Sequence, residues 1–125
     1  MATKKKIVLA EDDAYISLAY SDGIRRAGFD VTVAMDGEDA LKKIRAGKPD
    51  LILLDLIMPV RDGFSVLHSL KEDPALSQIP VIILSNLGQD SEIQEGKSLG
   101  AVDYLVKANV SMKEVIERIQ AVFKK

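Results

Sequence analysis

The sequence contains no cysteine and only one histidine among its 125 residues. Without cysteine the chain has no disulfide, no thiolate nucleophile and no zinc–thiolate site. No apolar run approaches the ~20 residues that a membrane-spanning helix needs. The formal net charge of −2 gives no reason to expect a nucleic-acid or membrane partner. We therefore expect a cytoplasmic protein that uses neither partner.

The remaining composition is that of an ordinary globular protein, with 47% hydrophobic and 29% charged residues. This length and apolar content predict one domain over residues 1–125, with a core of its own. The basic run Lys4 to Lys6 is short, so we interpret it as solvated chain rather than as a nucleic-acid-binding arm.

Five short apolar runs, rich in β-branched residues or leucine, recur along the chain. They lack the apolar–polar alternation of a strand with one solvated face, which is typical of strands buried on both faces of a parallel sheet. The predicted strands are residues 7–10, 31–34, 51–54, 81–84 and 104–106.

Between these strands, apolar residues recur at three- and four-residue spacing, which predicts helices. A first helix is predicted by an apolar stripe of Ile16, Ala19, Tyr20, Ile24 and Ala27, with Gly28 as its stop. A second helix follows the candidate cap Asp36 and ends near Gly47, and a third begins near Asp62. In the last helix, Ser111 and Glu114 have capping-box spacing, and apolar residues from Met112 to Phe123 form one stripe.

The segment from Asp90 to Leu99 is the weakest predicted helix. Ile93 and Leu99 are its only large apolar residues, and Gly96 lies within it, so we expect it to be the least firmly held element. Five strands alternating with five helices predict an α/β domain built on a doubly wound parallel sheet. In such sheets the ligand site lies at the carboxyl ends of the strands, where strand order reverses.

Polar residues stand at the ends of four predicted strands: Glu11, Asp12 and Asp13, then Asp55, then Ser85 and Asn86, and finally Lys107. Clustered carboxylates without histidine or cysteine favour Mg²⁺ as their cation. A carboxylate is then placed to attack phosphorus and form an aspartyl phosphate. Lys107 would neutralise the phosphoryl oxygens, and Ser85 would donate a hydrogen bond to them.

Each of these residues also has an ordinary structural explanation. Aspartate and asparagine after a strand are often turn residues or helix caps, and Asp13 suits an N-cap. A single lysine after a strand is usually a solvated charge. His68 is expected at the surface and Met58 in packing. The functional interpretation depends on the conjunction of such residues at four strand ends, which chance would rarely produce.

Four segments resemble the successive motifs of response-regulator receiver domains, in the same order and spacing: IVLAEDD, DLILLDLIMPVRDGFSVL, VIILSN and GAVDYLVKA. The resemblance covers essentially the whole chain, and the D-x-x-M-P-x-x-D-G run from Asp55 to Gly63 is highly specific. It implies a flavodoxin-like three-layer sandwich with strand order 2-1-3-4-5. It also implies a signalling switch that catalyses only its own phosphorylation and dephosphorylation.

The resemblance assigns roles by position. Asp55 matches the phosphoacceptor. Glu11 and Asp12 match the acid pair that organises Mg²⁺, for which Mn²⁺ could substitute, with Asp12 as the direct ligand. The backbone carbonyl of Ile57 matches the third protein ligand, so its side chain matters little for metal binding.

Three further positions match the family's switch machinery. Ser85 matches the hydroxyl that reorients toward the phosphoryl group, Tyr104 the aromatic that follows the switch, and Lys107 the active-site lysine. The implied phosphodonor is a histidine kinase or a histidine phosphotransfer protein. The expected moving parts are the weak fourth helix and the strand of Tyr104. No output domain is visible in these 125 residues, so we expect output through contact with an unknown downstream protein.

Two positions depart from the family. The residue after the lysine is usually proline in a cis bond, whereas here it is Ala108. A cis bond before a non-proline residue costs about 2.5–4 kcal/mol, so we expect a trans bond and a less well anchored Lys107. The residue after the switch hydroxyl is usually very small. Here it is Asn86, which we expect to crowd the phosphoryl pocket or to hydrogen-bond with its contents.

Two alternatives come from other classes. An aspartyl-phosphate phosphohydrolase would want a second acid two residues after the nucleophile, and Ile57 at that position argues against it. A binding module that works without phosphorylation would keep the fold but lose Asp55, the acid pair or Lys107, all of which are present.

Overall fold

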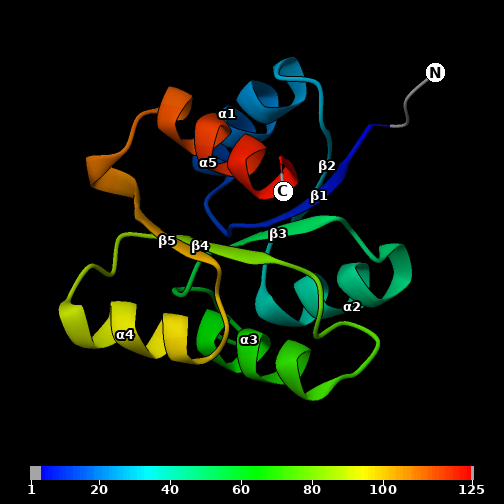
Figure 1. Ribbon diagram of the computed structural model, residues 1–125, viewed down its shortest axis with the longest axis vertical. Helices are drawn as coiled ribbons and strands as arrows, with labels where there is room; N and C mark the ends of the chain where they lie inside the picture. Colours follow the sequence, from blue (N-terminus) through cyan, green and yellow to red (C-terminus); the bar gives the residue numbers. More distant parts are fainter. Residues whose placement is uncertain (1–3, 125) are drawn as a thin grey trace.

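The computed structural model describes residues 4–124 and places a parallel sheet between two helical layers (Figure 1). The strand order is β2-β1-β3-β4-β5, so the predicted flavodoxin-like fold is confirmed. The strands are β1 (Lys6–Ala10), β2 (Asp30–Ala34), β3 (Leu51–Leu54), β4 (Val81–Ser85) and β5 (Asp103–Val106). Each of their bounds lies within one residue of the predicted run.

Helices α1 and α5 cover one face of the sheet, and α2, α3 and α4 cover the other (Figure 1). The helices are α1 (Ala14–Arg26), α2 (Gly37–Gly47), α3 (Gly63–Glu72), α4 (Asp90–Ser98) and α5 (Met112–Phe123), with a 3₁₀ turn η1 (Lys107–Asn109) between β5 and α5. Side chains cap four of the five helices at their N-termini: Asp13, Asp36, Asp62 and Ser111 each accept a backbone N–H.

Every residue of β3 and β4 is buried, which explains why these runs show no polar alternation. Their side chains divide between two apolar clusters, one on each face of the sheet. Ile52 and Leu54 join the cluster under α2 and α3, whereas Leu51 and Leu53 join the cluster under α1 and α5. The buried strands thus hold the residues at their carboxyl ends in fixed positions.

The buried face of α1 differs from the predicted apolar stripe. Ala19 and Ala27 are exposed, whereas Ser17 and Ser21 are buried beside Ile24. Each serine hydroxyl donates to a carbonyl one turn earlier in the helix, at 3.1 Å. Because the helix itself satisfies these hydroxyls, small polar residues fit against the sheet where the stripe predicted alanine.

Helix α4 has the shallowest packing of the five helices. Gly96 is its only buried residue. A methyl group at Gly96 would lie 2.5 Å from Cδ1 of Ile83 and 3.3 Å from the ring of Tyr104. The helix therefore approaches the sheet most closely through a glycine, and its one large apolar residue, Ile93, packs on the core while only partly buried.

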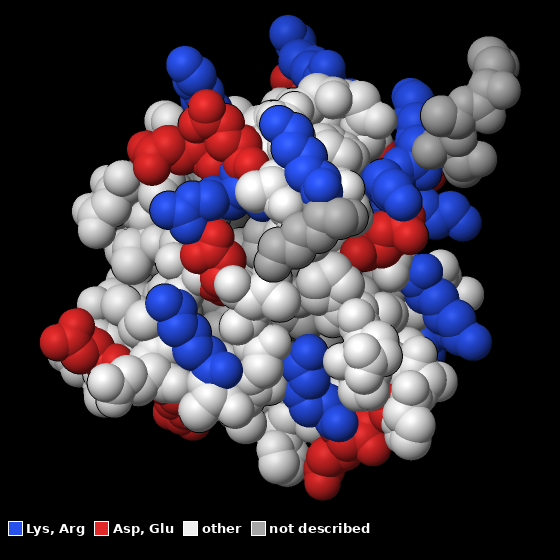
Figure 2. Space-filling model, viewed as in Figure 1, with Lys and Arg blue, Asp and Glu red and all other residues white. Residues whose placement is uncertain are grey.

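The surface carries both signs of charge. Basic and acidic side chains are interspersed on the face shown in Figure 2, and Lys4, Lys5 and Lys6 are exposed. Along residues 4–124, no helix has the length and apolar character needed to cross a membrane.

Candidate phosphoryl-transfer site

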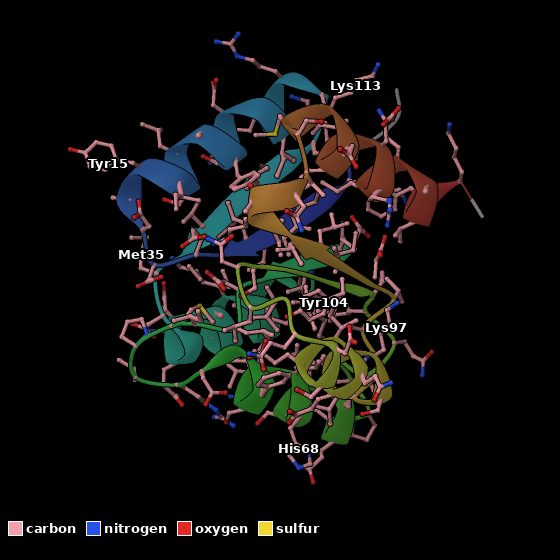
Figure 3. All side chains as sticks on the ribbon, turned by 90° about the vertical axis from the view of Figure 1, so that its left-hand side faces the viewer. Tyr15, Met35, His68, Lys97, Tyr104 and Lys113 are labelled. Atoms are coloured by element: carbon pink, nitrogen blue, oxygen red, sulfur yellow. The ribbon has the colours of Figure 1, made fainter. Side chains whose placement is uncertain are left out.

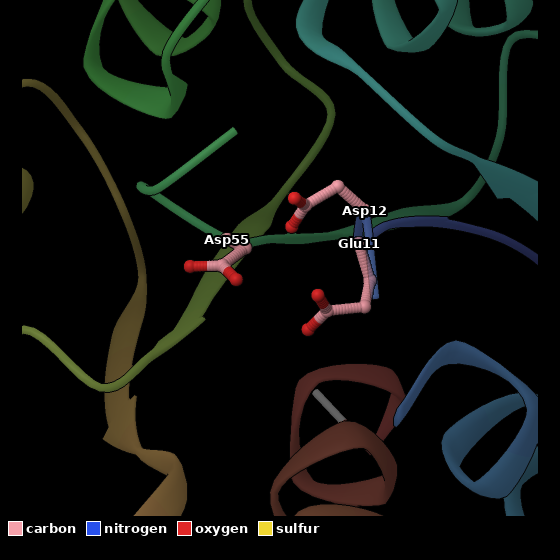
Figure 4. Close-up of side chains that lie close together, drawn as sticks. All are labelled: Glu11, Asp12 and Asp55. Atoms are coloured by element: carbon pink, nitrogen blue, oxygen red, sulfur yellow. The ribbon is translucent and has the colours of Figure 1, made fainter. Parts of the chain in front are cut away.

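Three carboxylates meet at the carboxyl ends of β1 and β3 (Figure 4). Glu11, Asp12 and Asp55 each offer an oxygen, and these oxygens lie within 4.8 Å of one another. Glu11 and Asp55 are only 2% and 6% exposed, whereas Asp12 is open to solvent. Burial raises the pKa of Glu11, although hydrogen bonds from Lys107 and from the Asp13 amide oppose it. Such a cluster favours a cation.

Lys107 supplies a positive charge to the same cluster. Its Nζ lies 2.7 Å from Oδ2 of Asp55 and also contacts Oε1 of Glu11. Burial alone would lower the pKa of Lys107, but hydrogen bonds to Asp55 and Glu11 more than offset burial and raise it. Lys107 therefore links the residues that follow β1 and β3.

The expected weak anchoring of Lys107 is wrong. Among residues 4–124 there is no cis peptide bond, so the bond before Ala108 is trans as predicted. The ammonium nevertheless reaches Asp55, because β5 delivers Lys107 directly after Val106, the residue opposite Ser85 in the ladder. The lysine therefore reaches the acids without the help of a proline turn.

Strand register brings the acids side by side. Ala10 is paired with Leu54, and the N–H of Asp55 donates to the Ala10 carbonyl at 3.1 Å. Behind Asp55, a Cβ on Gly63 would overlap the Asp55 carbonyl and approach Cα of Leu56. Glycine at the start of α3 thus lets that helix lie directly against the strand end.

The donor set fits a hard divalent cation, since it contains only oxygen ligands. Asp13 is not part of it, because its carboxylate caps α1 by accepting from Tyr15 and Ile16, as predicted. The Ile57 N–H donates to Oδ1 of Asp55 at 3.1 Å, which ties this residue to the cluster. Its carbonyl as a metal ligand stays a prediction.

Ser85 and Tyr104 meet at the backbone of Leu87. The fully buried Ser85 hydroxyl accepts from the Leu87 N–H at 3.4 Å, and the Tyr104 hydroxyl donates to the Leu87 carbonyl. Tyr104 lies between the sheet and α4 (Figure 3). Sequence reasoning missed Leu87, because the link uses backbone groups that every residue except proline carries.

Asn86 contacts the turn that follows Lys107, and its expected effect on the phosphoryl pocket stays a prediction. Its side-chain oxygen accepts a hydrogen bond from the Ala108 N–H at 3.1 Å. His68 points away from the sheet at the surface, as expected (Figure 3), with its Nε2 3.4 Å from the Glu72 carboxylate. The structure thus brings Glu11, Asp12, Asp55 and Lys107 together and leaves His68 outside the site.

Comparison with known proteins points to one family. The family model of the response regulator receiver domain matches residues 7–120. The DNA-binding dual master transcriptional regulator RpaA of Synechocystis is 37% identical over 120 residues, which are 96% of this chain and 49% of that protein. The chain spans about half the length, or less, of the curated relatives it matches.

Solved structures agree with this match. The receiver domain of a Francisella response regulator is 36% identical, with a TM-score of 0.89, and the match covers 97% of this chain and 98% of that one. The chemotaxis protein CheY4 of Vibrio cholerae is 28% identical, with a TM-score of 0.89 and coverage of 96% and 99%. With the acid cluster and lysine at its strand ends, the chain belongs to the response regulator receiver domain family.

Proposed function

We propose that Asp55 is the phosphoacceptor of this receiver domain and takes its phosphoryl group from a phosphohistidine. The observation that carries the proposal is the cluster itself, in which a buried carboxylate lies 2.7 Å from an ammonium and beside two further acids. One Asp55 oxygen forms a bond to phosphorus as the bond from phosphorus to the donor's imidazole nitrogen breaks. The imidazole, protonated on its other ring nitrogen, leaves with the electron pair of that bond as the neutral base.

A divalent metal, Mg²⁺ or Mn²⁺, would be held by Glu11, Asp12, Asp55 and the Ile57 carbonyl. When bound, it would offset the negative charge of the acids and of the incoming phosphoryl group. Lys107, which contacts both Asp55 and Glu11, would neutralise the remaining phosphoryl charge. Neither group needs proton transfer, since positioning and charge neutralisation do most of the work in phosphoryl transfer.

The phosphoryl group would be sensed through Ser85 and Tyr104. If the Ser85 hydroxyl turns toward the phosphoryl oxygens, it leaves the Leu87 N–H, and the Leu87 backbone is free to shift. Tyr104, bound to the Leu87 carbonyl and packed near Gly96, carries that shift to α4. The exposed surface of α4 and β5 is therefore the proposed output surface.

The proposed donor is a histidine kinase or a histidine phosphotransfer protein in the cytoplasm, and no other substrate is turned over. The downstream partner is a protein that contacts α4 and β5. The absence of a nucleic-acid partner stays a prediction, and the name of the DNA-binding relative weighs against it.

Incubation with Mg²⁺ and acetyl phosphate, followed by intact mass, tests the proposal. We expect one added phosphate in the wild type, none after Asp55→Asn, and none when EDTA removes the metal. Asp22→Asn is the matched control, because it removes an exposed carboxylate on α1 and should still accept phosphate. A phosphate on the Asp55→Asn variant would contradict the assignment, and an unmodified wild type would favour a phosphorylation-independent binding module.

A further inference from the structure

Asn86 and Ala108, the two residues that depart from the receiver pattern, contact each other. The Asn86 side-chain oxygen accepts the Ala108 N–H at 3.1 Å. Proline at position 108 would have no N–H to donate, and a very small residue at position 86 would have no side-chain acceptor. The two departures therefore form one structural feature, in which each residue needs the other.

This hydrogen bond lies just beyond the last pair of the β4–β5 ladder. That ladder ends with Ser85 opposite Val106. Beyond it, the side chain of Asn86 links the segment that follows β4 to the segment that follows β5. The N–H belongs to the peptide group that joins Lys107 to Ala108. Because a peptide group is planar, holding its N–H also restricts rotation about the Cα–C bond of Lys107.

Lys107 depends on its backbone for its position. The strand holds the residue before it, but the next two residues, Ala108 and Asn109, are exposed, so packing contributes little after it. The side chain of Lys107 itself is only 9% exposed and ends between Asp55 and Glu11. A rotation at its backbone would therefore move the ammonium away from the carboxylates.

We propose that Asn86 is a positioning residue that acts through Ala108 to hold Lys107 in register with Asp55. The proposal rests on the proposed phosphoryl transfer to Asp55. The Asn86–Ala108 bond is exposed to solvent, so its loss should change overall stability little. Misplacing the neutralising charge should instead slow the transfer, since small errors of position are costly in phosphoryl-group chemistry.

A double-mutant cycle tests this dependence with four proteins: wild type, Asn86→Ala, Ala108→Pro and the double variant. The rate of phosphate gain is followed by intact mass over a range of acetyl phosphate concentrations at saturating Mg²⁺. We expect Asn86→Ala to lower the maximal rate by roughly three- to ten-fold, with the half-saturating donor concentration and the unfolding temperature nearly unchanged. In the Ala108→Pro background the same change should have no effect, because the donor is already absent.

Two further variants separate positioning from a general effect on the turn. Asn109→Ala removes an amide side chain from the same turn without touching the Ala108 donor, and it should keep the wild-type rate. Asn86→Asp keeps an acceptor oxygen. Amide exchange measured by NMR should therefore show the Ala108 N–H protected in the wild type and in Asn86→Asp, and exposed in Asn86→Ala.

Two outcomes would overturn the positioning role even if Asp55→Asn still abolished phosphate uptake. One is an equal rate of uptake in the wild type and Asn86→Ala. The other is an Asn86→Ala change that slows uptake as much in the Ala108→Pro protein as in the wild type. Unchanged protection of the Ala108 N–H in Asn86→Ala would overturn it as well, without any reference to phosphorylation. A wild type that gains no phosphate would overturn the proposed function and this proposal together. In that case the wild type and Asp55→Asn would both keep their unmodified mass.

Discussion

The interior of the sheet and its carboxyl edge differ in what their side chains gain from folding. All four residues of β3 are apolar and 0% exposed. One residue further along, Asp55 stands in a cluster of three acids, and the nearby turn exposes the apolar side chains of Ile57 and Val60. We therefore infer that the interior contributes stability and that the edge gives some of it up to hold a reactive arrangement. Substitutions should accordingly destabilise the interior and stabilise parts of the edge.

The largest effect should come from Leu53→Ala. Leu53 is fully buried on the central strand, in the cluster under α1 and α5. We expect a loss of about 2–5 kcal/mol in the free energy of unfolding, from lost apolar burial and the cavity left behind. Urea denaturation measures it. Leu18→Ala is the control, because Leu18 is 65% exposed and should change stability by less than about 0.5 kcal/mol.

Gly63→Ala tests how closely the backbone of α3 packs against the backbone at Asp55. The added methyl group would overlap the Asp55 carbonyl and cannot be relieved by turning a side chain. We expect a loss of about 1–3 kcal/mol by overpacking, together with slower phosphate uptake. Gly47→Ala is the control, because nothing lies within 4 Å of its added methyl group, and it should be neutral or slightly stabilising. Equal stability of the two variants would contradict the close packing behind Asp55.

Asp12→Ala should raise the free energy of unfolding, unlike the two substitutions above. It removes one of three neighbouring carboxylates, so in EDTA we expect a gain of about 1 kcal/mol through relief of repulsion. With Mg²⁺ added, the wild type should gain stability and the variant should not, because the variant has lost a proposed ligand. Thermal unfolding at both conditions measures this difference. A wild type that is more stable than Asp12→Ala in EDTA would show that the cluster carries no strain.

The sequence predicted the interior and the acid cluster well, because both leave patterns along the chain. Buried strands appear as unbroken apolar runs, and the acids follow directly after them. A parallel sheet then brings strand ends such as Glu11 and Asp55 to the same edge of the sheet. The cluster of Glu11, Asp12, Asp55 and Lys107 was therefore predictable from the residues, whereas the strand order came from the resemblance to receiver domains.

What the sequence could not predict depends on hydrogen bonds between loops. Asn86 has several possible partners, and only the folded β4–β5 end reveals that Ala108 is the one it contacts. The Leu87 backbone leaves no trace in the sequence. In α1, Ser17 and Ser21 are buried in place of Ala19 and Ala27 of the predicted apolar stripe. Their burial is possible because their hydroxyls donate to carbonyls of the same helix.

The smallest expected effect concerns Val60, which has a φ of +68° and is 77% exposed in the turn between β3 and α3. A β-branched residue is unfavourable in this left-handed region, whereas asparagine tolerates it. Nothing in the sequence signals this conformation, because valine is not a residue that such turns favour. Because the side chain is exposed, replacing it sacrifices little apolar burial.

Val60→Asn should therefore stabilise the protein by about 0.5–1 kcal/mol, as relief of backbone strain at the edge. The control is Val102→Asn, a second exposed valine whose φ is not positive, which should be neutral or slightly destabilising. Unfolding curves of both variants, recorded in EDTA, give the comparison directly. If Val60→Asn gained no more than Val102→Asn, the turn would hold no strain, and the stability lost at the edge would lie in the acid cluster alone. If it gained stability and still accepted phosphate at the wild-type rate, the strain at Val60 would be separable from the chemistry at Asp55.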